Sequence, residues 1–438
     1  MKDQIRSYLL AQLYAEVCER DRQSVDPLSK AIYDRLRELY WTVSRILRQG
    51  LKLIGSRGKN YKPPPRMLVD ENLIYGSACR RVLIDMTPTA RSDIGTGIQR
   101  VVREVVKAAI ESGEGFPVMI IDGRLCVYAR GAVEPTPLDI RSGDTLLLLD
   151  SGWLYVSEYR PIVDLVRARG GRNVVCLYDL FPIVYGAAFS AALRANFKKW
   201  FEEIILPADG VAAISHSVAN EFERYCQERR LMRVATQQLG VWTLGADFTE
   251  EVKTAPTTRV RAIAEARSPF FLSVGTLAPN KGQALCLSAF EKLWAGGIDV
   301  TLVIVGRPGW NTTALERRLL EHPEHGRRLF WLSDANDAEL QSLYRCARAV
   351  ICASYAEGFG LPLIEAAHAG APVIASDIEI FHEVGGDSVA YFDMLDPESL
   401  MKQIVETLAS EKRAPPLPVL SWKESTQRLL DTIESQAL

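Results

Sequence analysis

Residues 357–365, Glu-Gly-Phe-Gly-Leu-Pro-Leu-Ile-Glu, place two carboxylates around a glycine-rich turn. The apolar run 350–354 before the turn has the length of a buried strand, and residues 363–369 after it have a helical pattern. A glycine turn between strand and helix presents backbone N–H groups and the positive end of the helix, which favours a phosphate or diphosphate. Glu357 is itself negative, so we expect it to contact a neutral hydroxyl group, and Glu365 to accept a hydrogen bond from a ribose. The stretch predicts a nucleotide-sugar pocket; the competing interpretation is an ordinary strand-turn-helix unit with solvent-facing glutamates.

The same stretch resembles the Glu-x7-Glu signature of retaining glycosyltransferases of family 4, and other segments extend the resemblance. Residues 270–274 followed by 275–282, Gly-Thr-Leu-Ala-Pro-Asn-Lys-Gly, resemble the first strand and phosphate loop of that family's second domain. Residues 303–306 resemble its second strand, and residues 329–337 the loop that binds the base. The resemblance implies an α/β protein of the GT-B fold: two doubly wound Rossmann-like domains that face each other across a cleft.

The resemblance also implies roles for individual residues of the second domain. Glu357 would contact hydroxyls of the transferred sugar, Glu365 the ribose and Lys281 the diphosphate. Many family members have an arginine at the position of Thr276, and some have one at that of Asn280, whereas this chain has neither. Arg307, or backbone at 358–361, would then supply the missing contact to the leaving group. The expected donor-binding residues are Gly275, Thr276, Lys281, Arg307, Leu332, Glu357, Gly358, Phe359, Gly360, Leu361 and Glu365.

Three segments of the first domain are expected to face the diphosphate and the acceptor. Residues 93–100, Asp-Ile-Gly-Thr-Gly-Ile-Gln-Arg, lack the third glycine of a dinucleotide fingerprint. In the resembled family the corresponding loop closes over the diphosphate and the acceptor hydroxyl; the alternative is a flexible loop whose glycines serve only turns. The other two segments lie around Asp179 and in the Ser-His-Ser sequence 215–217. The residues assigned to this region are Gly95, Thr96, Gly97, Arg100, Tyr178, Asp179 and His216.

Several of these first-domain assignments leave alternatives. Arg100 would meet phosphate or cap a helix face, and His216 would contact substrate or have a surface or helix-capping role. The family would have a histidine before Asp179, but this chain has Tyr178, which can donate a hydrogen bond and cannot carry a proton near neutral pH. Asp179 is a candidate for orienting the acceptor. Together with Glu357 and Lys281, it makes up the expected catalytic set.

The expected reaction is metal-independent glycosyl transfer with retention of configuration. The sequence has no Asp-x-Asp pair to hold a cation, so a helix end and Lys281 would take the charge of the diphosphate. No cofactor is expected. A leaving phosphate oxygen can take the acceptor proton. The loop at 275–277 favours mannose from GDP only weakly, and UDP-sugars, dTDP-rhamnose and GDP-fucose remain open. Two alternatives are a nucleotide-sugar epimerase and a degenerate transferase retained as a binding or scaffold subunit.

Composition and patterning are typical of a two-domain cytoplasmic protein. The chain has 438 residues, of which 47% are hydrophobic, and a formal charge of −2, which does not suggest a nucleic-acid partner. Its eight cysteines are scattered and include no CxxC pair, as expected for reduced thiols. We expect a helical extension at 1–78, a first domain at 79–250, a linker at 251–268, a second domain at 269–415, and at 416–438 a helix that crosses back to the first domain.

The amino-terminal extension combines two amphipathic helical patterns with a basic region. No acidic residue occurs between Glu38 and Asp70, and apolar residues are interspersed with the arginines and lysines of the region from Arg45 to Arg66. This pattern predicts attraction to anionic lipid, and hence a peripheral enzyme at the inner face of the plasma membrane with a lipid-linked or glycan acceptor. The alternative is a helical hairpin that forms a homodimer or packs on the first domain.

Overall fold

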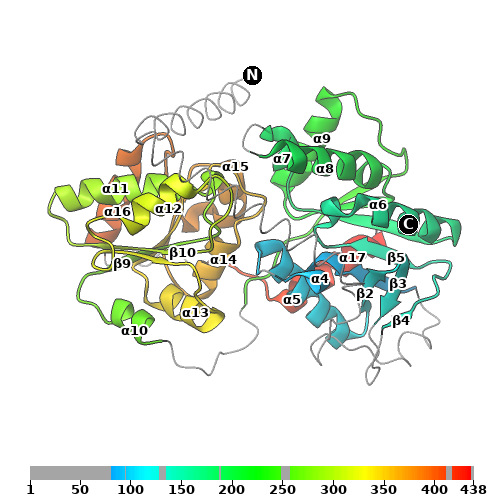
Figure 1. Ribbon diagram of the computed structural model, residues 1–438, viewed down its shortest axis with the longest axis horizontal. Helices are drawn as coiled ribbons and strands as arrows, with labels where there is room; N and C mark the ends of the chain where they lie inside the picture. The colour runs from blue at the N-terminus through cyan, green and yellow to red at the C-terminus, as the bar shows by residue number, and fades with distance from the viewer. Residues whose placement is uncertain are drawn as a thin grey trace, which may run out of the picture.

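The computed structural model describes residues 80–93, 95–127, 135–186, 189–247, 257–410 and 417–435. These residues form two α/β domains that lie side by side (Figure 1). The expected amino-terminal helices, the basic region from Arg45 to Arg66 and the polar segment 251–256 of the expected linker lie outside the described residues.

The first domain alternates strands and helices, as its apolar runs predict. Its elements are β1 (Val82–Asp85), α4 (Thr87–Arg91), α5 (Gly97–Ser112), β2 (Gly115–Ile121), β3 (Arg124–Val127), β4 (Thr136–Pro137), β5 (Thr145–Leu148), η3 (Gly152–Leu154), α6 (Val156–Ala168), β6 (Arg172–Leu177), α7 (Phe181–Val184), α8 (Ala191–Trp200), the π-helical turn η5 (Phe201–Ile205), β7 (Gly210–Ala213), α9 (His216–Glu228) and β8 (Gln238–Val241).

An eight-stranded sheet in the order β4-β3-β2-β1-β5-β6-β7-β8 forms the centre of this domain. The six strands from β2 to β8 are parallel, and the hairpin strands β3 and β4 extend the edge in antiparallel fashion. The sequence patterns did not predict this hairpin. Its signal was Asp122-Gly123, both with positive φ (48° and 74°), the dipeptide favoured in two-residue hairpin turns.

The second domain repeats the alternation. Its elements are α10 (Thr258–Ala264), β9 (Phe270–Val274), η6 (Pro279–Lys281), α11 (Gln283–Ala295), β10 (Thr301–Val305), α12 (Thr313–Leu320), β11 (Leu329–Leu332), α13 (Asp337–Cys346), β12 (Ala349–Cys352), α14 (Leu361–His368), β13 (Val373–Ser376), α15 (Glu379–Gly385), η7 (Gly386–Ser388), β14 (Ala390–Phe392) and α16 (Pro397–Ala409).

Its six strands are all parallel, in the order β11-β10-β9-β12-β13-β14. The strand order reverses between β9 and β12, and ligands of open parallel sheets bind at such a reversal, beyond the carboxyl ends of the strands. The loops that follow β9 and β12 contain Lys281 and Glu357, respectively. This topology therefore positions the candidate site.

Helix α10 lies within the range expected as linker. Its residue Arg259 forms ion pairs with Asp334, at 2.8 Å, and with Glu339, at 3.2 Å. Glu339 lies in the first turn of α13 and forms a capping box with Asn336, the residue that precedes the helix. Helix α10 is thus attached to the second domain.

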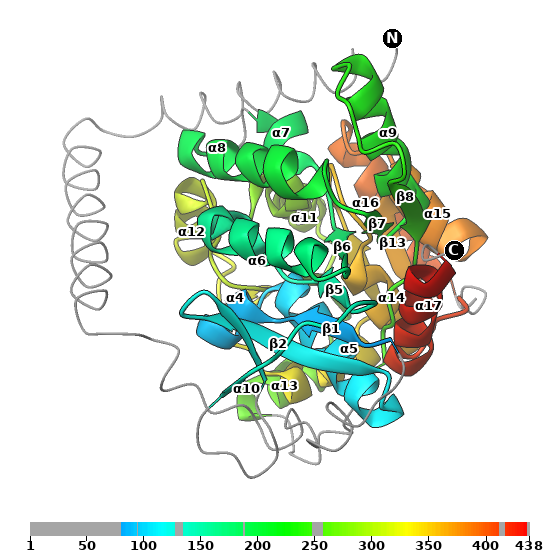
Figure 2. The same ribbon diagram turned by 90° about the vertical axis from the view of Figure 1, so that its right-hand side faces the viewer.

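The last helix, α17 (Trp422–Ser435), packs against α5 of the first domain (Figure 2). The Ser425 hydroxyl donates to the Thr243 carbonyl at 2.6 Å, and Trp422 is 1% exposed. A Cβ on Gly245 would lie 2.6 Å from the Trp422 backbone nitrogen, so glycine is required at this approach. The chain therefore crosses between the domains a second time.

A buried ion pair connects the start of β1 to the turn before β5. The Arg81 guanidinium donates to both carboxylate oxygens of Asp144, at 2.6 and 2.9 Å, and to the Asp139 carbonyl at 2.8 Å. Arg81 and Asp144 side chains are 1% and 2% exposed. Removing one partner of such a pair leaves an uncompensated buried charge.

We expect Asp144→Ala to lower the free energy of unfolding by about 3–5 kcal/mol, because Arg81 would remain buried without its counter-charge. Urea denaturation followed by circular dichroism measures the change. Asp164→Ala is the matched control, because its pair with Arg160 is about half exposed and should change stability by less than about 0.5 kcal/mol. Equal effects of the two variants would contradict this account.

Candidate functional site

Two glycines bring the loops of the second domain into close contact at the strand-order reversal. Gly306, after β10, has φ +154°, and a Cβ there would lie 1.9 Å from the Gly275 carbonyl oxygen. Gly282 has φ +66°, and its Cβ would lie 2.0 Å from the Ala353 carbonyl oxygen. Side chains at these positions would push the loops apart. The glycines therefore hold the loop of Lys281 directly against the loops that follow β10 and β12.

Lys281 and Glu357 form an ion pair with each other. The Lys281 Nζ lies 2.5 Å from Glu357 Oε1, and the Ser354 hydroxyl donates to the same oxygen at 2.6 Å. The structure therefore brings together the two residues expected to bind the diphosphate and the sugar. Each charge neutralises the other in this arrangement, so a substrate that engages both groups has to replace this contact.

Glu365 lies within α14, 3% exposed, and has partners on both carboxylate oxygens. Oε2 accepts from the Tyr344 hydroxyl at 2.7 Å, and Oε1 accepts from the guanidinium of Arg100 on α5. Burial raises the pKa of Glu365 above its usual value, while the positive charge of Arg100 acts in the opposite direction. The residue expected to bind ribose is therefore connected to the first domain.

The amino-terminal ends of α5 and α14 face each other at the domain boundary. A Cβ on Gly97, the first residue of α5, would lie 3.7 Å from a side-chain carbon of Leu361, the first residue of α14. Thr96 and Gln99 form a capping box that fixes the start of α5, and Gly95 before it has φ +72°. Two helix ends of partial positive charge thus lie close together, which favours an anion between them.

Gly358 forms a close backbone approach between the domains. A Cβ on Gly358 would lie 2.0 Å from the carbonyl oxygen of Tyr178 in the first domain. The carbonyl of Gly358 accepts from the hydroxyl of Ser215, which precedes α9, at 2.8 Å. Backbone of the Glu-x7-Glu turn therefore packs directly on the first domain.

Glu383 of α15 binds the first turn of α9 from across the boundary. Its carboxylate accepts from the backbone nitrogens of His216, at 2.7 Å, and Ser217, at 2.8 Å. The Ser217 hydroxyl donates to the same carboxylate at 2.6 Å. This negative group at the positive end of a helix is a further contact between the two domains. The sequence patterns did not identify Glu383, since its partner is distant in the chain.

The first-domain candidates differ in where their side chains lie. The Tyr178 hydroxyl donates to the Leu149 carbonyl at 2.8 Å and is buried. It lies in the core, which corrects the expectation that it faces an acceptor, and the tyrosine contacts the cleft through its backbone. Ser215, not His216, caps α9 with its side chain, and the His216 side chain is exposed.

Asp179 and Glu221 are two acidic groups with raised pKa values beside the cleft. Burial raises the pKa of Asp179 to about 6, and the nearby Glu357 carboxylate adds to the shift, whereas Lys281 opposes it. Burial also raises the pKa of Glu221 on α9 to about 7, with a further contribution from Asp179. Carboxyl groups from both domains therefore lie close together near Lys281. Glu221 had no sequence signal beyond its place in an amphipathic helix.

An aromatic pair that the sequence patterns did not identify also spans the boundary. Phe189, after α7, stacks on Trp310, after β10, with 5.2 Å between the ring centroids. The Trp310 indole nitrogen is buried without a hydrogen-bond partner among the described residues. Among the other expected donor-binding residues, Thr276 and Arg307 are exposed on the loops after β9 and β10, respectively. Leu332 and Phe359 are buried.

A small cavity beside Lys281 and Glu357 is lined only by residues of the second domain. The cavity there measures about 10 Å³, whereas ligand sites have volumes of roughly 300–1,000 Å³. A nucleotide sugar therefore needs more space than this cavity provides. Within the described ranges, no group of three or more His, Cys, Asp or Glu side chains could hold a metal ion.

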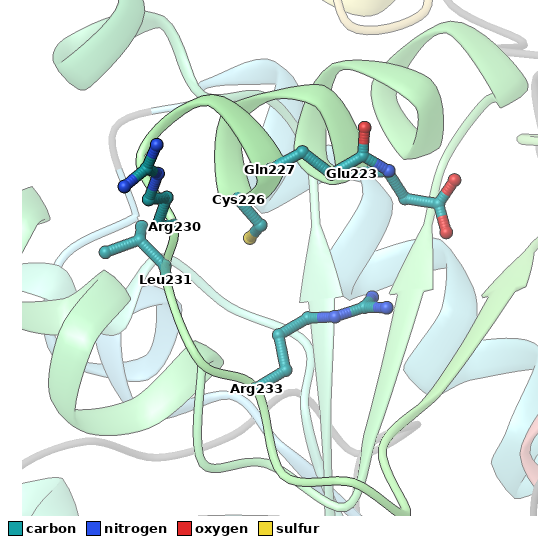
Figure 3. A pocket seen from close by; sticks show the side chains of 6 residues that line it. All are labelled: Glu223, Cys226, Gln227, Arg230, Leu231 and Arg233. Carbon is teal, nitrogen blue, oxygen red and sulfur yellow. The ribbon is translucent and has the colours of Figure 1, made fainter.

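A larger hollow, of about 320 Å³, lies at the end of α9 that points away from the cleft (Figure 3). Arg233 lies beneath the helix near Cys226, whereas Arg230 points away from it. The lining combines these basic groups with an acidic one and is separate from the site above. Its residues are Glu223, Cys226, Gln227, Arg230, Leu231 and Arg233.

Known structures share this architecture. Sucrose-phosphate synthase from Thermosynechococcus elongatus superimposes with a TM-score of 0.56 at 20% identity, covering 82% of this chain and 96% of that one. HepE of Anabaena, solved with UDP and glucose, gives a TM-score of 0.55 at 15% identity, covering 82% and 98% of the two chains. The two facing parallel sheets define a protein of the GT-B fold, as the sequence patterns predicted.

Sequence comparison identifies the family. Residues 257–415 match the family described as Glycosyl transferases group 1. A serotype-specific mannosyltransferase of Escherichia coli, WbdA, is 33% identical over 379 residues, which cover 81% of this chain and 46% of the relative. The chain thus spans about half the length of this relative and of two further WbdA sequences that match most of the chain. It belongs to the group 1 glycosyltransferases and is similar to their mannosyltransferases.

The described residues contain no helix that is long and apolar enough to cross a membrane.

Proposed function

We propose that the protein transfers a mannosyl group from a nucleoside diphosphate sugar to a glycan or lipid-linked acceptor in surface polysaccharide synthesis. One observation carries this proposal: Lys281, Glu357 and Asp179 come together from two domains beside the start of α14. The mannosyltransferase names of the relatives reported above support the sugar, and one shorter match is to an O-antigen chain mannosyltransferase. GDP is the proposed nucleotide.

In the proposed reaction, the bond between the anomeric carbon and the diphosphate oxygen breaks while the acceptor oxygen bonds to the same face of the sugar. The start of α14 and Lys281 stabilise the charge that grows on the diphosphate, without a metal ion. A leaving phosphate oxygen takes the acceptor proton, so no separate base is required. Glu357 binds the hydroxyls of the sugar, and Asp179 orients the acceptor. Retention of configuration follows from attack on the face that the leaving group departs.

For the whole protein, we propose a cytoplasmic location at the inner face of the plasma membrane. The basic region from Arg45 to Arg66 would bind anionic lipid, with dimerisation through the amino-terminal helices as the competing role. Liposome sedimentation of the full chain and of a chain without residues 1–62 separates the two. Equal sedimentation of both forms would favour dimerisation.

The nucleotide is tested by thermal shift with GDP, UDP, dTDP and their common sugar conjugates. A ligand that binds only the folded state at 100 times its Kd stabilises that state by about 2.7 kcal/mol. This corresponds to a rise in Tm of roughly 5–10 °C for a domain of about 150–250 residues. We expect a rise with GDP and GDP-mannose. A rise confined to another nucleotide would replace GDP, and no rise with any of them would favour a scaffold that has lost its site.

A further inference from the structure

Arg100 of the first domain supplies a positive charge at a place where the second domain has few positive charges. On the second domain, Thr276 and Asn280 of the loop after β9 are uncharged, and Lys281 is paired with Glu357. The Arg100 guanidinium is directed instead toward Glu365, although the two residues are 265 positions apart in the chain. Its side chain is 19% exposed in the closed arrangement.

The positions of Arg100 and Glu365 relative to the anion site are equivalent. Each lies one turn inside its helix, Arg100 three residues after the start of α5 and Glu365 four after the start of α14. Because one turn rises about 5.4 Å, the ion pair lies directly behind the two facing helix ends. A diphosphate bound between those ends would lie within reach of the long Arg100 side chain.

Ribose and Arg100 compete for one oxygen of Glu365. Tyr344 occupies Oε2 and Arg100 occupies Oε1, and the carboxylate is almost completely buried. Because Glu365 is almost completely buried, a ribose hydroxyl that reaches Oε1 has to enter the space that the Arg100 guanidinium occupies, and it competes with the guanidinium there. Removing one partner from a buried ion pair is unfavourable unless the other finds a new counter-charge. The diphosphate of the same ligand provides that counter-charge.

We propose that Arg100 is a positioning residue that exchanges partners, leaving Glu365 for the diphosphate when ribose binds. This inference rests on the function proposed above and adds how the site selects its ligand. A nucleoside competes with Arg100 for Glu365 and brings no negative charge of its own, whereas a nucleoside diphosphate brings one. The exchange therefore favours the diphosphate and draws the first domain onto the bound donor.

Titration calorimetry with GDP and with guanosine tests the exchange. Charge-assisted contacts contribute roughly 1.5–3 kcal/mol, so Arg100→Gln should weaken GDP binding about tenfold or more. Guanosine should bind the variant at least as tightly as it binds the wild type, because Glu365 is released. The ratio of the two affinities should thus fall by about tenfold or more, and Arg100→Lys should restore part of it. If the thermal panel selects another base, the corresponding pair of ligands is used.

Arg103→Gln is the control, since Arg103 lies on the same helix and pairs with Asp93 of the first domain at 2.6 Å. Its affinity ratio should match that of the wild type. An equal loss of both affinities in Arg100→Gln, or no loss of either, would overturn the exchange and leave Arg100 a structural bridge. Failure of the wild type to bind any nucleoside diphosphate would instead overturn the proposed function.

Discussion

Gly358→Ala should lower the kcat of glycosyl transfer by about 100-fold or more while nucleotide binding and folding are retained. The new Cβ would lie 2.0 Å from the Tyr178 carbonyl oxygen and 3.2 Å from Ile214, and both neighbours belong to the other domain. Gly358 does not have a positive φ, so alanine fits its own backbone. The substitution therefore prevents close approach of the domains, and misplacement of the reacting groups by about 1 Å can cost about 100-fold in rate.

The measurement combines transfer kinetics with calorimetric binding of GDP and a thermal melt. Gly296→Ala is the control: it changes a glycine of the same domain whose Cβ would meet only carbonyl oxygens at ordinary contact distances of 3.4 and 3.5 Å. Unchanged transfer by Gly358→Ala would show that the closed arrangement is not the one in which transfer occurs. Loss of GDP binding together with transfer would mean that the substitution disrupts the second domain itself.

Glu357→Gln should reduce transfer by about 100- to 1,000-fold, the range found when one preorganised electrostatic contact is removed from an active site. The amide keeps the size of the side chain but no longer neutralises Lys281, which lies 2.5 Å away. Lys281 would then be released for the diphosphate, so GDP without its sugar should bind at least as well as to the wild type. The expected signature is loss of transfer with retained or improved affinity for GDP.

Transfer assays and GDP titration of the same preparation check this pattern. Glu398→Gln is a suitable control, since its exposed pair with Lys292 lies on the surface at 3.2 Å and should affect neither quantity. Full transfer by Glu357→Gln would remove Glu357 from the proposed site. Loss of GDP binding would assign it to the nucleotide instead of the sugar.

The two effects differ in their physical origin. Gly358→Ala increases the distance between the backbones of the two domains, whereas Glu357→Gln removes a negative charge within the second domain. We therefore expect both variants to bind GDP, and only Glu357→Gln to retain the domain closure of the wild type. Small-angle scattering with and without GDP distinguishes the two.

Local sequence was sufficient to predict strands and glycine turns around the site. The predicted strand at 270–274 has those bounds in the structure, and the helix expected within 416–438 spans Trp422–Ser435. Hydrophobic periodicity and positive-φ glycines act over a few residues, so these features can be predicted from short windows.

Tertiary structure alone decided what the site residues contact. Sequence pattern selected Glu365 and Arg100 separately, yet only the packing of α5 against α14 made them partners. In the same way, burial directed Tyr178 into the core, and Glu383 became a helix cap for the other domain. Such contacts depend on how two sheets face each other, and no short window encodes that arrangement. The sequence by itself thus determined the architecture and the residue types of the site, and domain packing determined which charges neutralise one another.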